Sequence, residues 1–282
     1  MIASGKGDTL MKTMLRILAV AAVMLICSVP VMASATDSSL TDVQMKKKLI
    51  LGLDPTFAPM GYTDDNGEIV GFDIDVAREV CLRLGVELVC QPINWEDKEI
   101  ELNAKNIDCI WNGLSISPER LESMLISVPY MSNAMVLVVR ADSGIETKAD
   151  LEGKKLGLQK GSTADDALAE DRRFKASLGD DNIRYFRSNG DALQALQQGS
   201  LDAVLMDLVV AEHYVNTVAG EELALLEEKL MPEEYGIGFR KNDTALADKV
   251  NEILFMLDDD GTLERISEKW FGHDLTTVKY FR

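Results

Sequence analysis

The sequence is poor in the residues that bind metals and form cross-links. Its 282 residues include only two histidines and four cysteines. No cysteine pair has the CxxC spacing that is typical of zinc and redox motifs. The histidines, His213 and His273, lie far apart and have no partners at metal-ligand spacing. We therefore expect no metal site and no cofactor.

Positive charge is also scarce. The chain has 29 lysines and arginines against 47 aspartates and glutamates, which gives a formal net charge of -18. A strongly acidic protein repels nucleic acid and anionic lipid. We therefore expect no nucleic-acid partner.

Long apolar runs are missing from the body of the chain, and one short run lies near the start. Lys12 and Arg16 precede the apolar run 17–26, which is too short to span a bilayer. Small residues follow, and 31–33 or 33–35 would form a cleavage site. This order predicts a signal peptide over residues 1–35, and so an exported protein in the periplasm or at the cell surface.

Two alternatives stay open: a retained membrane anchor, and lipidation at Cys27 after cleavage. Ile26 disfavours lipidation, because a lipobox needs a small residue before the cysteine. Removal of residues 1–35 would change the net charge from -18 to -20 and leave about 247 residues, enough for two lobes of ordinary size. We expect a monomer.

The remaining cysteines are Cys81, Cys90 and Cys109, so at most one disulfide can form within the chain. A disulfide from Cys81 to Cys90 is plausible in an exported protein, and Cys109 is another potential partner. Three buried thiols are an equal alternative.

Strands and helices alternate along the chain, which predicts an α/β fold with two parallel-rich units. The expected strands are 48–53, 86–90, 107–111, 135–140, 155–159, 183–186, 203–206 and 235–240. The expected helices are 73–84, 96–104, 163–170, 191–198, 208–218, 244–257 and 262–270. In such sheets, ligands lie beyond the carboxyl ends of the strands.

The run Asp108–Arg120, DCIWNGLSISPER, is the most informative segment. An apolar strand ends in small polar residues, and a helix start follows, with Ser117 as N-cap and Pro118 at the first helical position. Free N–H groups, hydroxyls and the guanidinium of Arg120 would meet at this point. Such groups suit a carboxylate, so we infer a small carboxylic acid as ligand, in particular a free amino acid.

Other polar segments also follow strand ends: 54–57, 160–163 and Asp207. This coincidence predicts one shared cleft with the Asp108–Arg120 run. The charged helix start 96–101 is expected to be a solvated face.

Several segments resemble one family in order along the chain. They are GLDPTFAPM (52–60), GFDIDVA (71–77), NGLSISPER (112–120), DLEGKKLG (150–157), QKGST (159–163), LDAVLMD (201–207), YGIG (235–238), DGT (260–262) and KWFG (269–272). The chain resembles the extracytoplasmic solute-binding proteins of polar amino-acid ABC transporters, bacterial solute-binding protein family 3. The resemblance covers nearly all of the chain after the signal.

The resemblance implies a two-lobed, type II periplasmic-binding-protein-like fold, with two parallel-rich sheets joined by a two-strand hinge. Lobe 1 would comprise 45–134 plus 233–282, and lobe 2 would be 135–232. The hinge segments would be about 132–136 and 229–236. The implied function is high-affinity capture of a polar or basic L-amino acid and its delivery to an ABC permease by hinge closure.

Site roles also follow from the resemblance. For the α-carboxylate, it implies Arg120, Ser115 and the backbone donors of Ser162 and Thr163. For the α-ammonium, it implies Asp207 and the Gly113 carbonyl. For the side chain, it implies stacking by Phe57 and Trp95, with Asp54 near its tip.

Each role has a structural alternative. Arg120 could be a surface residue paired to Glu119 or Glu122. Asp207 could serve merely as the cap of the helix that follows it. Phe57 and Trp95 could be core aromatics. The remaining acidic candidate, Asp54, could be a turn residue before proline.

The ligand stays open among arginine, lysine, histidine, glutamine and cystine. Trp111 and Asn112 stand where basic amino-acid binders have small residues. Two other functions are weighed. One is an exported cyclohexadienyl-dehydratase-like enzyme, which would need a positioned acid or base in the cleft. It is disfavoured because no Ser-His-Asp set is seen, and 113–117 lacks the second glycine of a nucleophile elbow. The other is a ligand-sensing receptor module. We expect a binding protein without catalytic activity.

Overall fold

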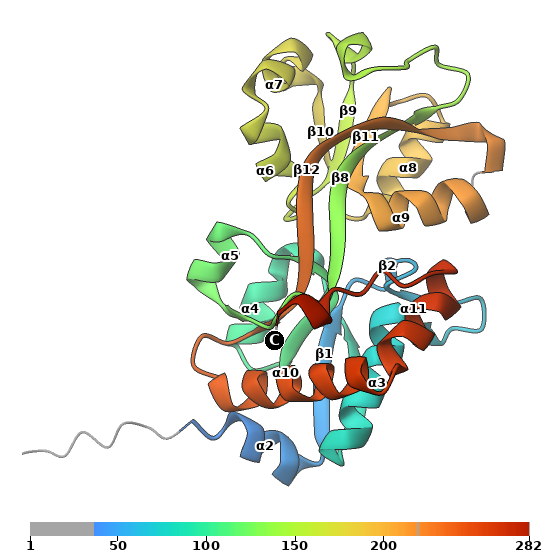
Figure 1. Ribbon diagram of the computed structural model, residues 1–282. Helices are drawn as coiled ribbons and strands as arrows, with labels where there is room; N and C mark the ends of the chain where they lie inside the picture. Colours follow the sequence, from blue (N-terminus) through green and yellow to red (C-terminus); the bar gives the residue numbers. More distant parts are fainter. Residues whose placement is uncertain (1–36, 219, 282) are drawn as a thin grey trace, which may run out of the picture. The chain divides into compact units, whose positions relative to one another are not determined.

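The computed structural model describes residues 37–218 and 220–281, whose helices and strands form two lobes (Figure 1). The expected signal peptide and Cys27 lie outside the described residues. Among the described residues, no helix has both the length and the apolar character that crossing a membrane requires.

Two sheets are present in the described part. The strands of the large sheet are β1 (Lys48–Leu53), β5 (Glu87–Pro92), β6 (Cys109–Ser115), β7 (Leu125–Ile126), β8 (Met131–Arg140), β9 (Leu156–Gln159), β10 (Ile183–Phe186), β11 (Ala203–Asp207) and β12 (Leu223–Phe239). The small sheet consists of β2 (Thr56–Phe57), β3 (Gly61–Thr63) and β4 (Ile69–Val70).

Helices cover the large sheet. The α-helices are α2 (Ser39–Lys46), α3 (Phe72–Leu84), α4 (Lys98–Asn103), α5 (Pro118–Ser123), α6 (Ala164–Glu170), α7 (Arg172–Leu178), α8 (Asn189–Gln197), α9 (Leu208–His213), α10 (Thr244–Asp259) and α11 (Thr262–Phe271). Shorter turns are η1 (Trp95–Asp97), η2 (Lys148–Leu151), η3 (Asp180–Asn182), η4 (Tyr214–Val218), η5 (Gly220–Glu222) and η6 (Val278–Tyr280).

The large sheet has parallel ends and an antiparallel centre. Its order is β10-β9-β11-β8-β12-β6-β1-β5, and β7 pairs with β12. β1 runs parallel to β5 and β6, and β9 runs parallel to β10 and β11. β8 and β12 pair antiparallel with each other and extend between the two lobes (Figure 1). The predicted two-lobed α/β fold is confirmed, and β8 and β12 join the two expected parallel-rich sheets into one continuous sheet.

Local sequence explains many boundaries. α3 ends at Gly85, whose φ of 70° is left-handed and suits a residue without a Cβ. The buried face of α3 includes Ile74, Val80 and Leu84 at helical spacing, as expected. Expected strands 48–53 and 183–186 coincide with β1 and β10.

The largest difference from expectation is β12. The expected strand 235–240 is only the end of a 17-residue strand, Leu223–Phe239. Its first part carries acidic residues and a proline, and these mask the strand pattern. Pairing with β8, with register shifts near Lys229, keeps this segment extended. The short elements α2, α7, β2, β3, β4 and β7 are also absent from the expected list.

The three described cysteines are free thiols. Cys81 and Cys109 are buried and Cys90 is half-buried, so the thiol alternative describes the structure and the disulfide does not. Burial raises the pKa of the Cys81 thiol to about 12, because a thiolate would lose its hydration there.

Candidate functional site

Arg120 lies one turn into α5, as the N-cap pattern predicts. Ser117 is the N-cap, and its side chain accepts a hydrogen bond from the Arg120 backbone N–H at 3.3 Å. The Arg120 side chain is buried, and its guanidinium donates to the carbonyl oxygens of Ser115 at 2.7 Å and Gly161 at 3.2 Å. Arg120 is therefore not a surface residue. It reaches from the end of β6 to the loop after β9, which belongs to the other lobe.

Asp207 lies at the end of β11, directly before α9. Its side chain makes no capping hydrogen bond to that helix. Its Oδ1 accepts hydrogen bonds from Asn133 Nδ2 at 2.8 Å and from the Tyr235 hydroxyl at 2.7 Å. Asp207 is thus held by the two long strands β8 and β12, and the capping alternative does not account for its side chain.

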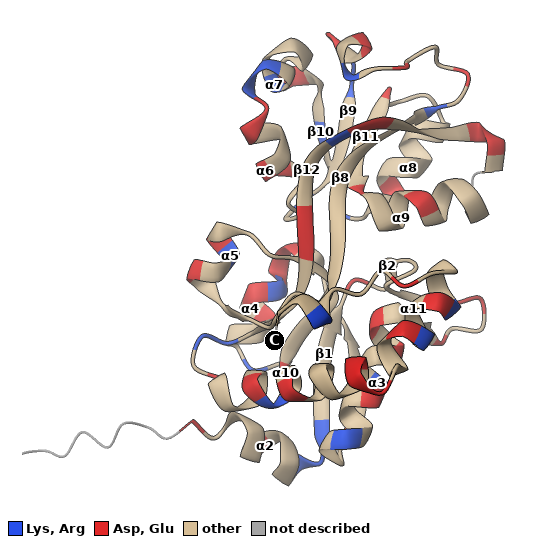
Figure 2. Ribbon diagram, viewed as in Figure 1, with Lys and Arg blue, Asp and Glu red and all other residues tan. Residues whose placement is uncertain are grey.

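Glu233 on β12 is a second buried carboxylate beside Asp207. Its Oε2 accepts hydrogen bonds from Ser115 Oγ at 3.0 Å and from Asn133 Nδ2 at 2.9 Å. Its Oε1 accepts a hydrogen bond from the Thr163 hydroxyl. The acidic stretch of β12 runs between the two lobes (Figure 2). Glu233 therefore links one lobe, through Ser115, to the other, through Thr163.

These groups form one charged network. Burial raises the pKa of Asp207, and the neighbouring Glu233 carboxylate raises it further. Burial likewise raises the pKa of Glu233, although its hydrogen bonds and Arg120 oppose the shift. Burial lowers the pKa of Arg120, while Glu233 and Asp207 raise it. Two carboxylates thus face one guanidinium in a poorly solvated place, where an added ammonium would be favourable.

The aromatic candidates are both buried. Phe57 and Trp95 are each 6% exposed, and each also packs in a hydrophobic cluster, so a core role and a site role coexist. Gly113 has a φ of 59°, and a Cβ there would lie 2.7 Å from the Phe57 ring. Its N–H donates to Asp73 Oδ2 at 2.7 Å. Glycine at this position lets the ring approach the β6 backbone.

Asp73 supports Gly113 from the start of α3. It is fully buried, and this burial raises its pKa to about 7. In the sequence, Asp73 stands out only as part of the family segment 71–77.

The loop 160–163 bridges the lobes. The Ser162 hydroxyl donates to the Gln159 carbonyl at 2.8 Å. Lys98 Nζ donates to the Gly161 carbonyl at 2.9 Å and lies 5.1 Å from the centre of the Trp95 ring. The exposed pair Lys160–Glu96 adds a contact at 2.7 Å.

Lys98 corrects one expectation. The helix start 96–101 was expected to be solvated, but Lys98 is 5% exposed. Its burial lowers the pKa of its ammonium to about 8. Lys98 is buried by its contacts with Trp95 and with the distant loop 160–163. The local charge pattern indicates neither contact.

Asp54 lies at the end of β1 and is also buried. Its Oδ1 accepts hydrogen bonds from the Thr56 backbone N–H at 2.9 Å and hydroxyl at 2.7 Å, as in a turn. Its Oδ2 accepts a hydrogen bond from Gln159 Nε2, from the other lobe, at 2.7 Å. The turn role and a place in the cleft are therefore compatible.

The structure brings eight of the nine candidates around one small space, which we call the inner site. Its lining is Phe57, Trp95, Gly113, Ser115, Arg120, Gln159, Ser162, Thr163 and Asp207. Asp54 touches it through Gln159. The space measures about 10 Å³, close to what one water requires. An amino acid therefore needs the lobes to move apart before it can enter.

The sequence patterns do not point to Asn133, Glu233 or Lys98 as site residues. A polar residue inside a long buried strand is a usable signal, and Asn133 fits it. Glu233 lies two residues before the YGIG segment, but its run of acidic neighbours looks like solvent-facing sequence. Within the described residues, no group of three or more histidine, cysteine, aspartate or glutamate side chains is arranged to hold a metal ion.

Comparison with known proteins identifies the family. Residues 49–273 match the model of the bacterial extracellular solute-binding proteins, family 3. The chain belongs to this family. This solute-binding protein is 32% identical to the L-cystine-binding protein TcyJ of Escherichia coli (strain K12) over 262 residues, which cover 92% of this chain and 96% of the relative.

Solved structures agree with this assignment. A substrate-binding protein of an ABC uptake transporter from Streptococcus pneumoniae, with bound histidine, superposes with a TM-score of 0.83 at 36% identity. The match covers 86% of this solute-binding protein and all of that chain. The ancestral amino acid-binding protein AncCDT-1, a precursor of cyclohexadienyl dehydratase, gives a TM-score of 0.76 at 30% identity, with 83% and 100% coverage.

Proposed function

We propose that this solute-binding protein captures a free amino acid outside the cytoplasm and delivers it to an ABC permease. The observation that carries the proposal is the meeting of Arg120 and Asp207, from opposite lobes, in one buried space. Relatives that bind cystine and histidine support an amino acid as the ligand class. We place the protein in the periplasm or at the cell surface.

The charges of the inner site complement a zwitterion. Arg120 would bond the α-carboxylate through its planar fork, with Ser115 and the backbone donors of Ser162 and Thr163 beside it. Asp207 and the Gly113 carbonyl would accept hydrogen bonds from the α-ammonium. Both poles of the ligand lose water in the cleft, so each pole needs a buried partner of opposite charge.

Binding would proceed by hinge motion. We assign lobe 1 to 45–134 plus 233–282 and lobe 2 to 135–232, with hinge segments at about 132–136 and 229–236. Opening would break the contacts of Gly161 with Arg120 and Lys98, and a bound ligand would replace part of them. Because a ligand that touches both lobes favours the closed form, closure follows binding.

A thermal-shift screen tests the proposal. The mature protein is heated with each of the twenty amino acids, cystine and prephenate-like acids, and consumption of each compound is measured in parallel. We expect one amino acid or a related group to raise the Tm without being consumed. The proposal fails if no amino acid raises the Tm. Consumption of a cyclohexadienyl acid would instead favour the enzyme, an alternative raised by the similarity to AncCDT-1.

A further inference from the structure

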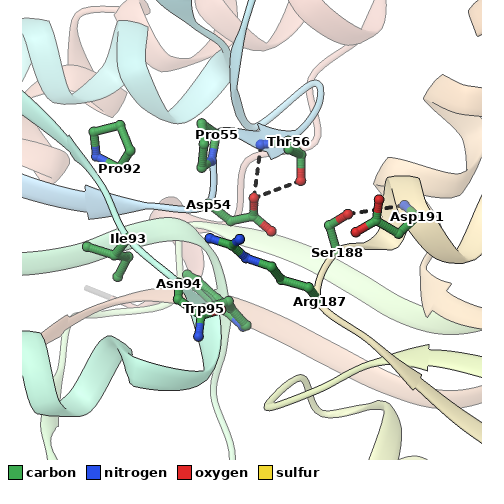
Figure 3. A pocket seen from close by; sticks show the side chains of 10 residues that line it. All are labelled: Asp54, Pro55, Thr56, Pro92, Ile93, Asn94, Trp95, Arg187, Ser188 and Asp191. Atoms are coloured by element: carbon green, nitrogen blue, oxygen red, sulfur yellow. Dashed lines mark hydrogen bonds between the residues drawn. The ribbon is translucent and has the colours of Figure 1, made fainter.

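A second and wider pocket adjoins the inner site. We call it the outer pocket, and it measures about 350 Å³, within the range of small-molecule sites. One lobe contributes residues 54–56 and 92–95, and the other contributes Arg187, Ser188 and Asp191 (Figure 3). Trp95 lines both spaces, so a ligand held at Arg120 and Asp207 would extend past this ring into the outer pocket.

The outer pocket contains charges of both signs. Arg187 and Asp191 lie between the end of β10 and the first turn of α8, and Figure 3 shows the Arg187 side chain extended toward Asp54. Within the described residues, neither the Arg187 guanidinium nor the Asp191 carboxylate has a hydrogen bond or an ion pair. Asp54 has three hydrogen bonds already, which leave one lone pair of Oδ2 for a ligand.

This combination discriminates between ligand classes. A lone cationic side chain, as in arginine or lysine, would use Asp54 and Asp191 but would meet repulsion from Arg187. A neutral side chain would give none of these three charges a partner of opposite sign. A second α-amino-acid head uses every group, because its carboxylate fits the guanidinium fork and its ammonium fits the two aspartates.

We propose that the outer pocket binds the second head of a two-headed amino acid, two α-amino-acid groups joined by a short chain, as in cystine. This inference rests on the proposed function, since the first head must be held at Arg120 and Asp207. Arg187 is then a specificity-determining residue for the far carboxylate.

Calorimetry with matched ligands tests the inference. LL-Diaminopimelate and L-lysine have the same chain and differ by one carboxylate, and L-cystine is the second two-headed probe. In the wild type we expect both two-headed ligands to bind at least about tenfold more tightly than lysine, as for a charge-assisted hydrogen bond. In Arg187→Ala this preference should fall below about threefold, because the far carboxylate loses its partner and lysine binds slightly more tightly once the repulsion is removed.

Arg184→Ala is the matched control. Arg184 lies on β10, three residues before Arg187, and its guanidinium donates to the carbonyls of Asp181 and Ile183, outside the outer pocket. We expect this variant to keep the wild-type preference. A higher affinity for lysine or arginine than for either two-headed ligand would overturn the inference. An unchanged preference in Arg187→Ala would also overturn it. Either result would leave the proposed function intact. Failure of every amino acid to bind would overturn both.

Discussion

The two ends of the cleft use the same kinds of charged groups in opposite ways. In the inner site, Arg120 and Asp207 are buried and hydrogen-bonded, and they line a space of about 10 Å³. In the outer pocket, Arg187 and Asp191 are exposed and lie in a space of about 350 Å³.

This difference separates affinity from selectivity. A buried charge that loses its partner keeps its full desolvation cost, so the inner site strongly favours a ligand with both poles. An exposed charge stays hydrated without a ligand and contributes a smaller, salt-dependent term. We therefore expect the inner site to decide whether an amino acid binds and the outer pocket to decide which one.

Loss of Arg120 should have the largest effect. In Arg120→Ala, the ligand carboxylate would lie buried without its counter-charge, and binding should weaken by about 3–5 kcal/mol. Isothermal titration calorimetry with the ligand found in the thermal-shift screen measures the loss. The exposed Arg173→Ala is the matched control and should bind normally. Near wild-type affinity in Arg120→Ala would contradict the expectation that the buried inner site contributes more to affinity than the exposed outer pocket.

The pH dependence of affinity should be the next largest effect. The raised pKa values of Asp207 and Glu233 mean that a falling pH protonates this pair, and the ligand ammonium then loses its counter-charge. Affinity should fall by at most roughly tenfold per pH unit between pH 8 and pH 5, with proton release on binding. Calorimetry in two buffers of different ionisation enthalpy measures both quantities.

Stability without ligand should respond with the opposite sign. A raised native pKa means that the native state holds the proton more tightly than the unfolded chain, so this stabilisation is lost as the pH rises. Asp207→Asn should flatten both slopes, because it leaves only Glu233 to titrate. An affinity that stays constant, or rises in acid, would contradict the assignment of the ammonium to these carboxylates.

The exposed contact between the lobes should matter least. Lys160 and Glu96 are 58% and 45% exposed, so solvent screens their attraction. We expect Lys160→Ala to change the Kd by less than about twofold. A double-mutant cycle with Glu96→Ala isolates the pair. A change of more than about tenfold would mean that exposed charges also control closure.

The candidate site was predictable where its signals are local. Ser117 and Pro118 predict the helix start that carries Arg120, because N-cap chemistry acts over three residues. Asp207 was found because it follows a buried strand. Asn133, Glu233 and Lys98 were not found, since their roles depend on partners 63 to 118 residues away.

The fold divides in the same way. The parallel ends of the large sheet were predictable, because apolar strand-like segments alternate along the chain with segments of helical periodicity. The first part of β12 was not, because Leu223–Glu234 lacks a strand pattern of its own. Its conformation comes from pairing with β8, which is a contact between distant segments.

The sequence by itself determined the alternation of strands and helices, the acidic charge and the family, since these follow from periodicity, composition and ordered segments. The tertiary structure alone decided that Glu233 and Asn133 join Asp207, that Lys98 is buried, and that Arg187 extends toward Asp54 in the outer pocket. Burial and proximity across a cleft depend on how distant segments pack, and this packing sets which charges lose water and which keep it.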